Sequence, residues 1–162
     1  MDAAVKRKLI SSDGKTVEVE DSCFKLSKVL TNLVNDFPEP EKELPINDVT
    51  EDTLKKIITY LEHYKDPEVK PKDIPKPLPG PDLKLVLDDW DFNYITPLSL
   101  QECVDLINGA NYLDIPELVT LVSARLASEM INCEVEEARA KFGIEPDMTQ
   151  EEMDEYDKYP LD

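Results

Sequence analysis

Apolar residues alternate with polar ones near the start of the chain, a pattern typical of half-buried β-strands. Val5 and Leu9 alternate with basic residues, and Val17 and Val19 alternate with glutamates. A turn that contains Gly14 separates the two runs. A period of two on either side of a glycine turn predicts an N-terminal β-hairpin.

From Ser22 the apolar residues recur at three and four positions, which indicates amphipathic helices. The first predicted helix ends at Phe37, because Pro38 follows it. A short strand is expected at residues 44–46, and Thr50 is placed to cap a second helix. The apolar positions of that second helix are Leu54, Ile57, Ile58 and Leu61.

Residues 66–82 contain six prolines, which interrupt this pattern. Proline fixes φ and lacks an N–H donor, so the segment is expected to form an extended, exposed loop or linker. No two of these prolines are three residues apart, which disfavours a role as a ligand of SH3-type domains.

The helical period returns after the loop. Trp90 is expected to anchor a short helix on the core, and Thr96 with Pro97 is expected to open the next helix. Gly109 allows close approach of a neighbouring element near the end of that helix. Asp114 is placed to cap a further helix that has a proline in its first turn.

Two short helices are predicted at the C-terminal end. The first carries Val135 and Phe142 and ends at Gly143, and the second opens with a capping box of Thr149 and Glu152. Their apolar positions are few and lie on one side. Helices of this length are marginal in water without packing, so they must dock on this protein or on another one.

The chain has 162 residues with 36 acidic and 18 basic side chains, and residues 85–162 hold 19 acidic against 4 basic ones. This length supports one domain with a sizeable core. The negative charge disfavours nucleic acids and anionic membranes as partners. The basic run of residues 6–8 is interpreted as a solvated strand face.

Three features bear on the compartment of the protein. Cys23, Cys103 and Cys133 are far apart and odd in number, which is typical of free thiols in a reducing environment. The chain begins without the apolar stretch of a secretory signal, and it contains no apolar run of membrane-spanning length. A cytoplasmic and nuclear location is expected.

The sequence offers little catalytic machinery. His63, the sole histidine, is interpreted as a polar residue at a helix end, and one histidine with scattered cysteines forms no metal-ligand cluster. The glycines are isolated, so no phosphate-binding loop is expected. Acidic residues that lie close together in the sequence could form a catalytic pair of carboxylates, but the high content of aspartate and glutamate is enough to explain them. We therefore expect a binding module without catalytic residues, cofactor or metal.

Several segments occur in the order found in one known family. These are residues 11–14, residues 54–58, the His63 region, Trp90 with Asp91, residues 109–115 and residues 136–144. Together they resemble the S-phase-kinase-associated adaptors of SCF-type, cullin-based ubiquitin ligases, over nearly the whole chain. The resemblance implies an α/β (α+β) fold of BTB/POZ type with two extra C-terminal helices. The implied parts are residues 1–65 and 83–131 for the core, 66–82 for the proline-rich loop, and 132–162 for the extra helices.

The resemblance also implies two binding surfaces. Asn111 and Tyr112 match the positions that contact the N-terminal region of a cullin in that family. The last helices correspond to the surface that holds the F-box of substrate receptors. The candidate F-box-binding residues are Val104, Val119, Leu126, Met130, Phe142, Ile144, Met148, Met153 and Tyr156.

The chain departs from the family pattern in its proline-rich loop and in a tail without the family's Trp-Cys pair, which predicts an altered set of partners. Three other functions are considered. One is an adaptor similar to elongin C, whose chains end near the stretch that matches Asp114. The others are a self-associating BTB domain, which is not favoured, and a small enzyme that uses carboxylates.

Overall fold

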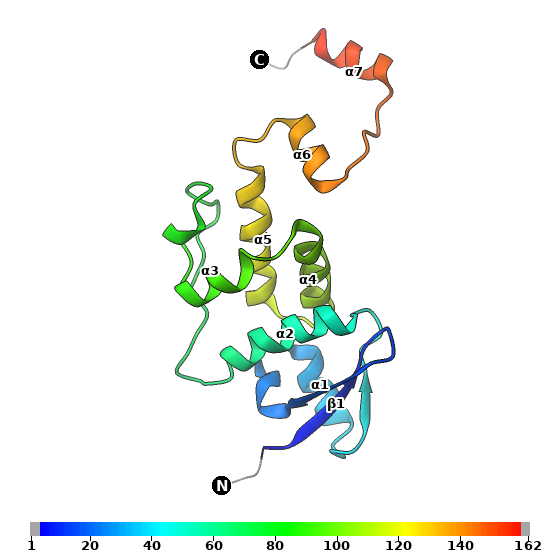
Figure 1. Ribbon diagram of the computed structural model, residues 1–162, viewed down its shortest axis with the longest axis vertical. Coiled ribbons are helices and arrows are strands. Elements are labelled where there is room, and N and C mark those ends of the chain that lie inside the picture. Colours follow the sequence, from blue (N-terminus) through cyan, green and yellow to red (C-terminus); the bar gives the residue numbers. More distant parts are fainter. Residues whose placement is uncertain (1–3, 160–162) are drawn as a thin grey trace. The chain divides into compact units, whose positions relative to one another are not determined.

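The computed structural model describes residues 4–159 of the chain (Figure 1). Internal contacts divide it into two compact units, which separate between Ile131 and Asn132. Each unit is described by itself. The first is a mixed α+β unit, which confirms the predicted fold class. Within residues 132–159, the described part of the second unit, the regular elements are helices.

The N-terminal hairpin is present as predicted. Strand β1 (Lys6–Ile10) pairs antiparallel with β2 (Thr16–Glu20), and Gly14 in the connecting turn has a φ of +73°. The third strand, β3 (Glu43–Pro45), pairs with β1 in parallel, so that the strand order is β2-β1-β3. Leu9 and Leu44 face each other across this parallel pair and are fully buried.

Arg7 contradicts the interpretation of the basic run as a solvated strand face. Its side chain lies on the same face of β1 as Leu9 and is only 4 % exposed. The guanidinium donates a hydrogen bond to the carbonyl oxygen of Phe37 at 3.2 Å, and its Nε lies 3.7 Å from the Asp21 carboxylate. A buried charge requires such partners, and only the two neighbouring lysines face solvent.

The first predicted helix is divided into two. A 3₁₀ helix, η1 (Asp21–Leu26), precedes α1 (Lys28–Asp36), and the buried Ser27 separates them. The Ser27 hydroxyl oxygen accepts a hydrogen bond from the Leu30 N–H at 3.1 Å and donates one to the Leu113 carbonyl at 2.6 Å. Ser27 therefore caps α1 and also ties it to a segment 86 residues further along the chain.

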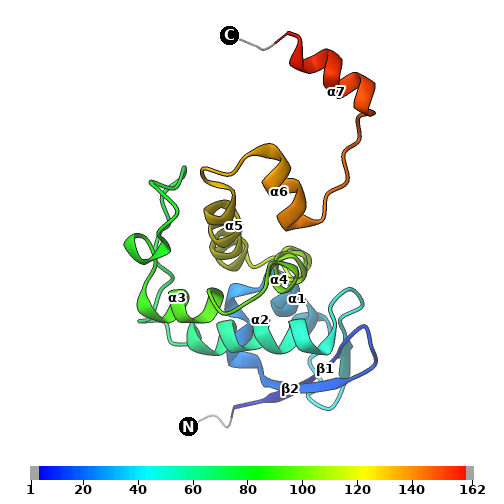
Figure 2. The ribbon, with the colours of Figure 1, turned by 45° about the horizontal axis from the view of Figure 1, so that its top comes forward.

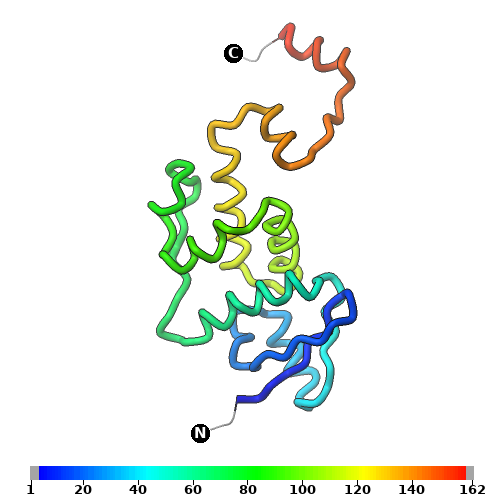
Figure 3. Tube along the Cα trace, in the orientation of Figure 1, coloured from blue at the N-terminus to red at the C-terminus, as the bar shows by residue number. Residues whose placement is uncertain are grey.

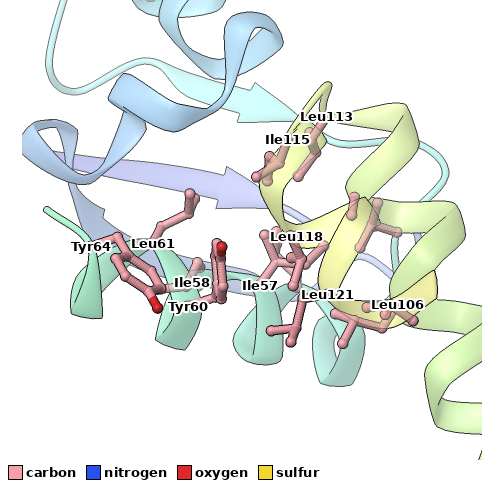
Figure 4. Packing of buried hydrophobic residues seen from close by; sticks show 14 of the residues in the cluster. Ile57, Ile58, Tyr60, Leu61, Tyr64, Leu106, Leu113, Ile115, Leu118 and Leu121 are labelled. Carbon is pink, nitrogen blue, oxygen red and sulfur yellow. The ribbon is translucent and has the colours of Figure 1, made fainter. Parts of the chain in front are cut away.

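Helices α2 (Glu51–His63) and α4 (Leu100–Tyr112) form the centre of the first unit. Figure 1 shows α2 between the sheet and the helices α4 and α5, and Figure 4 shows its apolar side chains directed into the core. Gly109 permits the close packing of α4 on α2. A Cβ atom there would lie 2.9 Å from Ile57 Cδ1 and 3.2 Å from Thr53 Cγ2.

The helix starts differ from the predicted caps. Thr50 precedes α2 but its side chain makes no capping hydrogen bond. Thr96 ends α3 (Asp89–Ile95) instead of opening α4, which begins after Ser99 with a Ser99–Glu102 capping box. Serine with glutamate three residues later satisfies two backbone donors, so it defines a stronger helix start than threonine before proline.

Helix α5 (Pro116–Met130) begins with the predicted proline. Asp114 does not cap it, because Ile115 occupies the N-cap position and no side chain completes a capping hydrogen bond. Asp114 instead has a φ of +52° and forms the turn after α4, where its carbonyl oxygen accepts a hydrogen bond from the Lys28 N–H. Aspartate tolerates this left-handed conformation better than most residues.

The proline-rich residues 66–82 form neither helix nor strand, as predicted (Figure 3). The segment nevertheless packs on the first unit. Ile74 is 7 % exposed and belongs to the hydrophobic core, and Leu78 is half-buried against it. A short 3₁₀ helix, η2 (Leu83–Leu85), follows the segment and leads to α3.

The second unit contains α6 (Val135–Phe142) and α7 (Gln150–Asp157). Gly143 ends α6 with a φ of +62°, and the predicted capping box of Thr149 and Glu152 opens α7. Residues 160–162 of the predicted C-terminal segment lie outside the described residues. Across residues 4–159, none of the helices has the length and apolar character needed to cross a bilayer.

Candidate functional site

His63, the histidine considered above as a possible catalytic residue, packs against an aromatic ring. The imidazole of His63 stacks on the indole of Trp90, with ring centroids 3.7 Å apart and an interplanar angle of 2°. His63 does end a helix as predicted, but it is half-buried rather than simply solvated. Within the described part of the chain, no cluster of histidine, cysteine and acidic residues could hold a metal ion.

Two of the three thiols are poor nucleophiles. Cys23 and Cys103 are buried, and burial raises the pKa of both thiols above the ordinary value for cysteine. A raised pKa reduces the thiolate fraction at neutral pH, and the thiolate is the reactive form. These cysteines therefore act as small core residues.

His63 and Trp90 belong to an aromatic cluster at the base of the proline-rich loop. Trp90 also stacks on Tyr94 at 5.0 Å, and Tyr60 and Tyr64 contact the same rings. The Tyr64 hydroxyl donates a hydrogen bond of 2.7 Å to Oδ1 of Asp91, which is 3 % exposed. Because Tyr64 follows α2 and Asp91 lies in α3, the cluster joins the two ends of the loop.

Burial raises the pKa of the Asp91 carboxyl above its ordinary value, the Tyr64 hydrogen bond opposes this shift, and the nearby Asp88 adds to it. A pKa that is higher in the folded state means that folding favours the protonated acid. This contribution is present below the pKa of the unfolded chain and is lost as the pH rises through the pKa of folded Asp91.

Tyr64→Phe is expected to lower the free energy of unfolding by about 2 kcal/mol at pH 7, because the buried Asp91 carboxylate loses its hydrogen bond. The deficit should shrink in acid, where Asp91 is protonated in both states. Urea unfolding followed by the fluorescence of Trp90, the only tryptophan, measures both effects. A deficit that is the same at pH 7 and at low pH would contradict this role of the hydrogen bond.

The predicted cullin-contacting residues lie in the last turn of α4. Asn111 is exposed, whereas Tyr112 is half-buried and packs partly against the core. One part of the Tyr112 ring therefore contacts the core, and another part is exposed to solvent. The turn that follows is fixed to α1 through Ser27 and Lys28. Asn111 and Tyr112 are consequently held on a rigid support.

The nine candidate F-box-binding residues differ in exposure, and none of them is fully buried. Val119 and Leu126 pack partly against the core, and Met130 is 48 % exposed at the end of α5. Because these three are seven and four residues apart, they lie on one face of the helix. Val104 is half-buried on the neighbouring helix α4.

The other five candidates lie in the second unit. Ile144 and Tyr156 are 55 % and 60 % exposed, and Phe142 and Met153 are half-buried. Met148 and Tyr156 line one hollow of about 440 Å³ together with Tyr159, which was not among the candidates. Neither α6 nor α7 has a buried residue. The second unit thus presents apolar side chains to solvent on both of its helices.

Sequence reasoning did not find an apolar groove on α5. Its walls are residues 74–78 of the proline-rich loop, one side of α5 and Ile131, the residue that follows the helix. Its volume is about 330 Å³. The α5 residues that line the groove recur at intervals of three and four residues, so the sequence could have predicted that they share one face of the helix. No sequence pattern predicts that the loop runs beside α5, as it does in Figures 1 and 2.

Two family models match the chain. The model of the Skp1 family tetramerisation domain matches residues 6–66, and that of the Skp1 family dimerisation domain matches residues 116–158. Together these two matches span more than half of the sequence.

Similar proteins are found in several organisms. The S-phase kinase-associated protein 1 homolog of Tetrahymena thermophila is 34 % identical over 149 residues, which are 92 % of this chain and 88 % of that protein. SKP1-like protein 18 of Arabidopsis thaliana is 31 % identical over 93 % of this chain and 90 % of its own length. The E3 ubiquitin ligase complex SCF subunit sconC of Arthroderma benhamiae is 31 % identical over 94 % and 92 %.

Proposed function

Because the chain belongs to the Skp1 family, we propose that it is a non-catalytic adaptor of an SCF-type ubiquitin ligase, which joins a cullin to F-box substrate receptors. Relatives that match more than nine-tenths of the chain are named as subunits of SCF ubiquitin ligase complexes, which supports this role in ubiquitin-dependent degradation. The observation that carries the proposal is the pair of helices α6 and α7, which expose apolar side chains and bury none.

The two binding tasks fall on different parts of the chain. Asn111 and Tyr112 at the end of α4 are proposed to contact the cullin, and tyrosine suits this role because it provides a large contact area. The apolar face of α5 and the second unit are proposed to hold the F-box. Residues 85–162, with 19 acidic and 4 basic side chains, favour basic surfaces on these partners.

The proposed location is the cytoplasm and nucleus. Cys23 and Cys103 are free thiols that lie buried in the first unit. Free thiols are usual in reducing compartments, which supports this proposal.

Of the alternatives, an adaptor similar to elongin C is disfavoured. Elongin C chains end near the stretch that matches Asp114, whereas the Skp1 dimerisation-domain model matches residues 116–158 of this chain. Self-association is proposed to play no part in the main function. Analytical ultracentrifugation of the isolated chain at micromolar concentration is expected to show a monomer, and a stable oligomer would favour the self-associating BTB alternative.

Reconstitution tests the proposal directly. The chain is expected to co-elute from a sizing column with an F-box protein and a cullin N-terminal fragment as one three-component complex. Neither partner should bind the other when the chain is left out. Failure of either pairwise complex with the chain would contradict the adaptor role.

A further inference from the structure

The groove between the proline-rich loop and α5 is distinct from the surfaces described above. Ile74 and Leu78 fix the loop on the first unit, and the segment between them leaves a hollow of about 330 Å³ over α5. Ala124, Ala127 and Ile131 form the helix side of this hollow. The small side chains of the two alanines leave room for a guest group, because a bulky residue at either position would fill the space.

The lining of the groove is unlike a solvated surface. One-third of the residues of this chain are charged, yet among residues 4–159 Lys76 is the only charged residue that lines the groove. The hydroxyls of Thr120 and Ser123 are its other polar side chains. Concave, mostly apolar hollows of at least about 300 Å³ with few polar groups are typical of binding sites. The groove therefore suits an uncharged, apolar group.

The groove adjoins the apolar face of α5 that carries Val119, Leu126 and Met130. Residues three and four apart are neighbours on a helix surface, so Ala127 of the groove lies next to Met130. Ile131 follows the helix as its C-cap residue. Ser123 belongs to the groove and lies between the two faces on the helix surface. A polypeptide bound to that face would therefore reach the groove without leaving α5.

The loop wall of the groove falls outside both family-model matches, which end at residue 66 and resume at residue 116. A wall that the family models do not include is unsuited to recognition of a motif shared by all receptors of the family. Such a wall is suited to recognition of a receptor segment whose sequence differs from one receptor to the next.

From these observations we infer that the groove takes one bulky apolar side chain of the substrate receptor, from a segment next to the F-box rather than from the F-box itself. The inference rests on the proposed adaptor function. Its consequence is that the proline-rich loop selects among receptors, whereas the face formed by Val119, Leu126 and Met130 binds their common motif.

Three variants test the groove. Ala127→Trp fills it from the helix side, and Leu78→Ser removes an apolar contact from the loop side. Thr59→Trp, on the exposed side of α2, is the matched control for a surface tryptophan. Each variant is titrated with the receptor from the reconstitution in two forms, the F-box alone and the F-box with its flanking segments. Retained cullin-fragment binding shows that each variant is folded.

For the receptor with flanking segments, Ala127→Trp is expected to weaken binding about thirtyfold and Leu78→Ser to weaken it less, because a buried apolar anchor is lost. For the F-box alone, all three variants should bind like the unaltered chain. Equal binding of Ala127→Trp and the unaltered chain to the longer receptor would overturn the inference.

Met130→Glu separates this failure from failure of the proposed function, because Met130 lies on the face proposed for the F-box itself. If Met130→Glu loses binding to both receptor forms while Ala127→Trp has no effect, the adaptor role stands and the groove has no part in receptor binding. If Met130→Glu also binds normally, the proposed receptor face is wrong. Self-association that disappears in Ala127→Trp would identify a second copy as the occupant and overturn the inference.

Discussion

Replacing Asn111 and Tyr112 together by lysine is expected to abolish binding of a cullin N-terminal fragment, with an affinity loss of about thirtyfold or more. Loss of an aromatic anchor at an interface typically costs about 2 kcal/mol or more, and the added charges have to be desolvated. F-box binding should persist, because the residues that we propose for it lie on other parts of the chain. Titration calorimetry with each partner separately measures the two effects.

Since the Tyr112 ring packs partly against the core, the double variant needs two controls. Asn111→Lys alone leaves the core untouched and should still weaken cullin binding. Thr59→Lys adds the same charge at an exposed position on α2 and should bind cullin normally. Unchanged cullin binding by the double variant would show that this turn is not the cullin contact.

Removal of residues 132–162 is expected to weaken F-box binding by about thirtyfold or more while cullin binding stays the same. The first unit has its own hydrophobic core, so it should keep a cooperative unfolding transition that Trp90 fluorescence reports. Helices α6 and α7 of the second unit contribute exposed apolar groups and no buried ones, so their removal is expected to cost binding rather than folding.

A full-length variant tests the same surface without truncation. Ile144→Asp combined with Tyr156→Ala removes two of the exposed apolar side chains and should reproduce most of the loss. Glu151→Ala, an exposed change on α7, serves as the control. Equal loss of cullin and F-box binding in the truncated chain would mean that the two surfaces are not separate.

Local patterns predicted the elements of this fold well but not all of their boundaries. The hairpin, the extended loop, the proline at the start of α5 and the capping box of α7 all depend on neighbouring residues. Thr96 and Asp114 failed as predicted caps because any serine, threonine or aspartate fits the pattern. The pair of Ser99 and Glu102 was visible in the sequence and would have given the correct start of α4.

Tertiary contacts account for what sequence patterns missed. The period of two places Arg7 on the same strand face as Leu9. Its burial, however, depends on the carbonyl of Phe37 and the carboxylate of Asp21, which the local pattern does not reveal. The stack of His63 on Trp90 joins residues on either side of the loop, and no local period indicates it. The exposure of the candidate F-box residues also requires the fold, since an apolar stripe alone does not tell which part of it faces the core.

The two hydrogen bonds of Ser27 have a consequence for the order of events during synthesis. The Ser27 hydroxyl caps α1 near the N-terminus. It gains its second hydrogen-bond partner, the carbonyl oxygen of Leu113, only when the ribosome has added 86 further residues. Contacts this distant along a chain form late, after intervening segments have been made. A nascent chain therefore completes the turn that we propose as the cullin contact only after residues up to Leu113 have emerged, and chains that terminate before this residue lack that turn.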